Sequence, residues 1–109
     1  MTCSNVQTVE FSQPIDVVFE SFAEAITLAG MNYPLKNEKT HNMKSARPFL
    51  VDFLGEKIFI SMKETSNGGT SVQVKSESAF PFTLYDMGNN KKNVDNLLMH
   101  ARTILKRKG

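Results

Sequence analysis

The residues from 56 to 79 constrain the fold most, because they read as a single β-hairpin. Apolar and polar residues alternate over Glu56–Glu64, which is the period of a strand with one buried face. The turn sequence Ser66–Gly69 contains Asn-Gly-Gly, and Asn and Gly tolerate the positive φ angles of tight hairpin turns. Thr70–Ala79 alternates again, so the pattern predicts two paired antiparallel strands.

The polar side of this hairpin is the candidate binding surface. It is predicted to point away from the helices and to carry Lys57, Phe59, Lys63, Gln73 and Lys75. An aromatic side chain among lysines suits stacking on a base or covering an apolar ligand. The alternative is that Phe59 packs at a dimer interface or beneath a loop, since large apolar groups are seldom exposed without a partner. The candidate contacts beneath a loop are Phe49, Phe53, Phe80 and Phe82.

Two segments have the period of amphipathic helices. The first follows Ser12-Gln13-Pro14, where Ser12 is predicted as the N-cap and Pro14 lies in the first turn. Its apolar residues recur at three- and four-residue steps as far as Gly30, a typical stop. The second runs from about Asn90 to Lys106 with a similar stripe. Each helix is therefore expected to bury one face against a sheet.

The remaining strands complete the predicted order. They are expected at Val6–Phe11, at about Tyr33–Lys39 and at about Asn42–Arg47, and Leu50–Leu54 is a further apolar run. The order is strand, helix, about four strands, helix. This predicts an α+β fold in which an antiparallel sheet of about five strands has one helix near each end, both packed on one face. A chain of 109 residues without repeats or linkers is expected to be one domain, residues 1–109.

Composition narrows the classes of protein to consider. There is no apolar run near the roughly 18 residues of a spanning helix, and the first residues do not resemble a secretory signal. Cys3 is the only cysteine, so no internal disulfide is expected and a reducing, cytoplasmic location fits best. The segment from Asn89 to Gly109 has six basic residues and one acidic residue. That excess suits an anionic partner, or simply the dipole at the end of a helix.

A cluster of Asp and Asn precedes and opens the second helix. Asp86, Asn89 and Asn90 are interpreted as structural caps, because Asp and Asn are among the best capping residues, and Asn93 follows them. The alternative is that their oxygens hold a ligand or metal, but one carboxylate among amides is a poor cation site. His41 and His100 lack partners at metal-ligand spacing. We therefore expect no catalytic residues, no metal, no cofactor and no enzyme activity.

The predicted β-α-β4-α order resembles two known topologies, those of the TATA-box-binding-protein type and of the helix-grip type, which includes START-like lipid-binding domains. The segments Gly55–Ile60, Gly69–Ser78 and Asp86–Val94, with Pro81, resemble a pattern found in small uncharacterised bacterial proteins. The helix-grip resemblance implies a small pocket for an apolar ligand between helix and sheet. Its expected lining is Phe19, Phe22, Leu97 and Leu98, which are more often plain core residues.

Three functions follow from these features as hypotheses. The first is a non-catalytic binding or protein-interaction domain that works through the open sheet face, with an unknown protein partner or a second copy. The second is a nucleic-acid-binding module that uses this face or the basic last helix. The third is the helix-grip pocket, for which a lipid ligand is the least favoured partner.

Overall fold

Five antiparallel strands form one sheet in the computed structural model, which describes residues 4–49, 52–78 and 89–108. The strands are β1 (Ser4–Phe11), β2 (Leu35–Asn37), β3 (Asn42–Phe49), β4 (Asp52–Glu64) and β5 (Thr70–Ser78). Their order across the sheet is β1-β5-β4-β3-β2. Helix α1 (Ile15–Leu28) follows β1, and α2 (Asn89–Lys108) follows β5. The predicted α+β class and element order are confirmed.

The β4–β5 hairpin has the predicted alternation. Ile58, Ile60 and Met62 are buried, and the register places Ile60 opposite Val74 and Met62 opposite Val72. In the turn, the amide of Thr65 donates to the carbonyl of Gly69 at 3.0 Å. Gly68 has a φ of +85°, the left-handed region in which glycine pays no steric penalty. One face of the hairpin is therefore core and the other is open.

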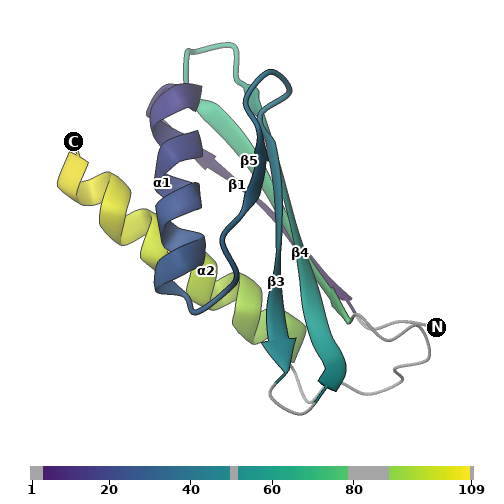
Figure 1. Cartoon of the computed structure of the whole chain (residues 1–109). Helices are drawn as coiled ribbons and strands as arrows, with labels where there is room; N and C mark the ends of the chain where they lie inside the picture. The colour runs from purple at the N-terminus through teal and green to yellow at the C-terminus, as the bar shows by residue number, and fades with distance from the viewer. Residues whose placement is uncertain (1–3, 50–51, 79–88, 109) are drawn as a thin grey trace.

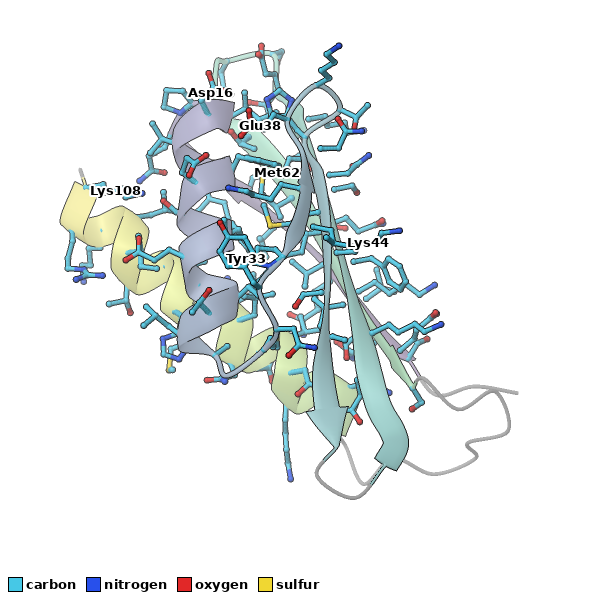
Figure 2. All side chains as sticks on the ribbon, viewed as in Figure 1. Asp16, Tyr33, Glu38, Lys44, Met62 and Lys108 are labelled. Carbon is cyan, nitrogen blue, oxygen red and sulfur yellow. The ribbon has the colours of Figure 1, made fainter. Side chains whose placement is uncertain are left out.

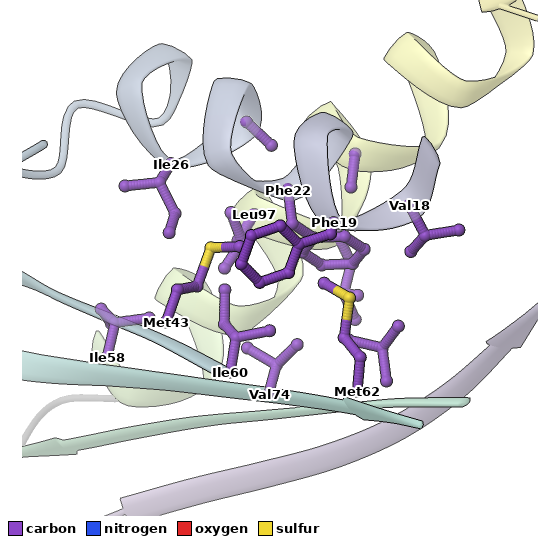
Figure 3. Close-up of a cluster of buried hydrophobic side chains, with 14 of the residues drawn as sticks. Val18, Phe19, Phe22, Ile26, Met43, Ile58, Ile60, Met62, Val74 and Leu97 are labelled. Carbon is purple, nitrogen blue, oxygen red and sulfur yellow. The ribbon is translucent and has the colours of Figure 1, made fainter. Parts of the chain in front are cut away.

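Both helices cover the same face of the sheet, and Figure 1 shows the opposite face without a helix. α1 and α2 also pack against each other. Figure 3 shows side chains of α1, the sheet and α2 meeting in one layer. The most buried large residues of this core are Phe22, Ile26, Ile58, Ile60, Leu97, Leu98, Ile104, Leu105, Val18, Val72, Val74 and Val94. Two separate helical stripes thus share one hydrophobic core.

The start of α1 differs from the prediction. Ser12 is not the N-cap: the helix begins at Ile15, and Pro14 occupies the capping position with extended backbone and no side-chain cap hydrogen bond. The φ of Pro14 is −62°, which the ring imposes and which already suits the entry into a helix. Just before it, the carbonyl of Gln13 accepts a hydrogen bond from Thr70 Oγ1 at 2.9 Å. This hydrogen bond holds the residues just before α1 against β5.

The strands between the helices differ from the prediction in their bounds. β4 begins at Asp52, so most of the apolar run at residues 50–54 belongs to the long strand that continues to Glu64. β2 is only three residues long, and β3 extends to Phe49. The register between β3 and β4 shifts between Arg47 and Phe49: two steps along β3, from Arg47 to Phe49, correspond to four along β4, from Glu56 to Asp52. Such an irregularity depends on the pairing of the two strands, so the pattern of either strand alone does not predict it.

The first turn of α2 is joined to the sheet by a buried polar network, not by apolar contacts alone. Ser76 Oγ donates to Asn90 Oδ1 at 2.7 Å, and Asn90 Nδ2 donates to Ser78 Oγ at 3.2 Å. Asn93 Nδ2 donates to Glu56 Oε1 at 2.9 Å and to Ser76 Oγ at 3.2 Å. We define Glu56, Ser76, Ser78, Asn90 and Asn93 as the serine–asparagine network. These bonds run to side chains of β4 and β5, and the capping role predicted for Asn90 stays a prediction.

The remaining predicted caps are only partly visible. Asp86 lies outside the described residues, as do the side chains of Asn89, Phe49, Phe53, Phe80 and Phe82. The backbone of Asn89 begins α2. In the described part of the chain, no helix is long and apolar enough to cross a membrane.

Candidate functional site

One row of side chains crosses the whole outer face of the sheet, the face opposite the helices. Phe59 of β4 lies directly opposite Lys44 of β3 and Lys75 of β5. Lys44 in turn pairs with Leu35 of β2, and Lys75 pairs with Val6 of β1. Directly opposed residues of antiparallel strands point to the same face. These five residues therefore form one line, which we call the basic–apolar row.

A second row, two residues further along the strands, is polar and uncharged. It consists of residues that the strand register places opposite one another in turn: Asn37, Asn42, Ser61, Gln73 and Thr8. Amides and hydroxyls both donate and accept hydrogen bonds. We call this line the amide–hydroxyl row. The two rows are neighbours over all five strands.

The apolar members of the first row are exposed. Phe59 is 37% exposed, Val6 48% and Leu35 69%. Figure 2 shows the side chain of Lys44 extending away from the helices, and Met62 on the helix side of the sheet. A hollow of about 460 Å³ opens over the middle of the face, lined by Leu35, Lys44, Phe59, Ser61, Gln73 and Lys75 among others. Its size lies within the range of small-molecule sites, although it is open rather than enclosed.

Two further hollows extend this surface. One of about 420 Å³ shares Leu35, Lys44 and Phe59 with the first and adds Tyr33 and Lys57. The other, also about 420 Å³, is lined by Thr8, Ser61, Met62, Lys63, Ser71 and Gln73. The surface is therefore a long, shallow track across the strands, centred on Phe59.

The track has an excess of positive charge. Among the described side chains on the outer face of the strands there are four lysines and two acidic residues. They are Lys44, Lys57, Lys63 and Lys75, and Glu10 and Glu77. Lys75 Nζ lies 3.1 Å from Glu77 Oε2, and both side chains are partly exposed. An exposed pair of this kind is worth little, so Lys75 can exchange Glu77 for an anionic ligand.

The five residues predicted for the binding surface all lie on this outer face. Phe59, Gln73 and Lys75 meet around the central hollow, whereas Lys57 and Lys63 line the two neighbouring ones. Lys44, Leu35 and Val6 were not among the residues predicted for this surface. For Val6 the signal was present, because it alternates with Thr8 and Glu10. For Lys44 and Leu35 the signal is the register of β2 and β3, which a local pattern does not contain.

His41 lies at another corner of the molecule. Its Nε2 is 3.3 Å from Asp16 Oδ1, and its ring packs edge-on to Phe19 with ring centroids 5.6 Å apart. His41 has a φ of +56°, at the turn between β2 and β3. Among the described residues, no group of three or more His, Cys, Asp or Glu side chains is placed to hold a metal ion. The polar contact at this corner is therefore a single one, between a half-buried ring and an exposed carboxylate.

The residues considered for an internal pocket lie in the core. Phe22 and Leu97 have no exposed surface, Leu98 is 2% exposed and Phe19 is 3% exposed. Phe22 also contacts Phe11 edge-to-face, with centroids 5.8 Å apart. All four belong to the buried core cluster, and Figure 3 shows Phe19, Phe22 and Leu97 between the helices and the sheet.

Comparisons with solved structures bear on the fold. The chain is similar to protein MLL2253 from Mesorhizobium loti, with a TM-score of 0.68 and 10% identity over 98% of this chain and 99% of that one. It is also similar to Ara h 8.0201, with a TM-score of 0.65 and 7% identity over 97% and 99%. Both neighbours fit a helix-grip-like α+β fold. No protein-family model matches the sequence, and no curated protein matches it significantly.

Proposed function

We propose that this chain is a non-catalytic binding domain whose working surface is the outer face of the sheet. The observation that carries the proposal is the basic–apolar row, in which a partly exposed Phe59 stands between Lys44 and Lys75 over a hollow of about 460 Å³. Exposed apolar groups that line a shared hollow are typical of interaction sites. Lysines on both sides add an electrostatic preference to that apolar contact.

The chemistry of the surface supports binding rather than catalysis. Ammonium, amide and hydroxyl groups can hold a partner, but general acid–base chemistry needs a group that titrates near neutral pH within reach of the reacting atoms. Of the two histidines, His41 contacts Asp16 in the corner beside α1, and His100 is on α2. Neither lines the hollows of the outer face that are described above.

An internal pocket for an apolar ligand is less well supported. The helix-grip-like neighbours share only the fold with this chain, at 7% and 10% identity. Phe22, Leu97 and Leu98 belong to the buried core cluster, and the interiors of folded proteins are usually close-packed. A cytoplasmic location and kinship with small bacterial proteins stay predictions from the sequence.

Amine labelling in cell extract tests the proposal. Lys44, Lys57 and Lys63 on the outer face are compared with Lys92 and Lys106, exposed lysines of α2. If a partner covers the face, the first three lysines react more slowly in extract of cells that make the protein than in purified protein, and the two controls do not. Phe59→Asp should abolish that protection. Equal labelling rates in extract and in purified protein would contradict a working surface on this face.

A further inference from the structure

We propose that the partner of the outer face is single-stranded nucleic acid, with one base stacked on Phe59 and the backbone phosphates held by the lysines beside it. This rests on the proposed function, because it names the partner of the same surface. The inference depends on the order of residues in the two rows. It does not depend on the overall net charge, which is only +2.

The charge of the face argues against a second copy of the chain. A face-to-face dimer would bring two sets of Lys44, Lys57, Lys63 and Lys75 together, with only Glu10 and Glu77 of each copy to offset them. Like charges opposed across an interface are unfavourable. The face therefore suits a partner that brings negative charge.

The position of Phe59 indicates that the partner also carries a planar group. Neighbouring strands are about 4.8 Å apart, so Lys44 and Lys75 flank the ring at nearly equal distances on its two sides. A planar group stacked on Phe59 would have an ammonium group within reach on either side. A base with a phosphate before and after it has this arrangement, and stacking on aromatic side chains is how open sheets hold unpaired bases.

The amide–hydroxyl row suits the edges of unpaired bases. These edges carry both hydrogen-bond donors and acceptors. Asn37, Asn42 and Gln73 supply both kinds of group, beside Ser61 and Thr8. In a double helix the bases are already stacked on each other, so Phe59 can reach only an unpaired base. This predicts a preference for single strands.

Fluorescence anisotropy with end-labelled mixed-sequence DNA and RNA of about 12 nucleotides tests the inference, since single-strand sites span that range. The wild-type protein should bind both single strands more tightly than the matching duplex. With phosphate contacts to Lys44 and Lys75, affinity should fall about sevenfold between about 50 mM and about 200 mM salt. Phe59→Ala should weaken binding about tenfold, because one stacking contact is lost. Lys44→Gln should lower the salt slope by about 0.7.

Two matched variants act as controls. Met99→Ala removes an exposed apolar side chain from α2, and Lys106→Gln removes an exposed lysine near its end. Both should leave the affinity unchanged. Circular dichroism of Phe59→Ala should match that of the wild type, because the side chain is partly exposed.

Three outcomes would overturn the inference. The first is no binding at about 100 µM protein, the weak limit of non-specific nucleic-acid binding. The second is equal affinity for duplex and single strands. The third is a loss on Lys106→Gln as large as that on Lys44→Gln, which would place binding on α2.

Nuclease treatment separates this inference from the proposed function. If lysine protection in cell extract disappears after digestion of nucleic acids, both stand. If protection persists after digestion, the outer face binds another partner and only the nucleic-acid inference fails. If no protection exists before digestion, the proposed function itself fails.

Discussion

Asn93 of α2 donates a hydrogen bond to Glu56 of β4, with 2.9 Å between Nδ2 and Oε1, and both side chains are buried. The bond joins residues 37 positions apart in the sequence. Loss of a hydrogen-bond donor to a buried carboxylate is destabilising, because burial has already removed the carboxylate from water. We therefore expect Asn93→Ala to reduce the free energy of unfolding by about 3 kcal/mol, measured by urea denaturation.

The same helix offers a control. Asn96→Ala changes the same residue type at a half-buried position, and its effect should stay within about 0.5 kcal/mol. Similar losses for the two variants would show that the bond to Glu56 does not stabilise the fold.

Phe22 tests whether the space between helices and sheet is core or pocket. The side chain has no exposed surface and packs edge-to-face on Phe11. Truncation of such a side chain leaves a cavity, so Phe22→Ala should reduce stability by about 3–5 kcal/mol in urea denaturation. Met99→Ala, at a position 53% exposed, should change it by less than about 0.5 kcal/mol. A small loss for Phe22→Ala would show that the site is not tightly packed.

Protonation of Asp95 at low pH should destabilise the folded protein. The pKa of this carboxyl is held below its ordinary value of 3.8, mainly because Lys91 Nζ donates a hydrogen bond to it at 2.6 Å and also because Gln7 donates one at 3.0 Å. A lowered pKa in the folded state contributes stability above pH 3.8, which is lost as the pH falls through the lowered value.

Replacing the main donor should therefore move that pKa. Lys91→Gln should raise the pKa of Asp95 toward its ordinary value, as followed by NMR titration of its carboxyl carbon. Lys92→Gln, which changes the next exposed lysine, should leave the titration unchanged. An unchanged pKa in Lys91→Gln would mean that the ion pair is not formed in solution.

Substitution of the two glycines of the β4–β5 turn should destabilise the protein for different reasons. A Cβ at Gly69 would lie 2.4 Å from the carbonyl oxygen of Phe11 on β1, whereas a Cβ at Gly68 would meet open space. Gly68→Ala should cost about 1–2 kcal/mol through its positive φ alone. Gly69→Ala should also separate the end of β1 from β5, which hydrogen exchange of the β1 amides would detect. Equal protection of β1 in both variants would contradict this contact.

Much of the architecture was predictable from local patterns. The alternation around Ile58, Ile60 and Met62 indicates which side of β4 is buried, because successive side chains of a strand point to opposite faces. The helical stripes identified Phe22 and Leu97 as inward-facing for the same kind of reason. The predicted N-cap of α1 was wrong. Ser12 and Pro14 both suit the entry into a helix, and only the surrounding contacts distinguish them.

The candidate surface, too, was predictable only in part from local patterns. The outward direction of Phe59, Lys57 and Lys63 follows from the period of a single strand, so the local pattern was enough to predict it. Three relationships could be read only from the folded chain. Lys44 and Lys75 flank Phe59, Gly69 lies against Phe11, and Asn93 reaches Glu56. The physical reason is range: a side chain's direction is set by its own backbone, but its neighbours across strands depend on register and packing among distant segments.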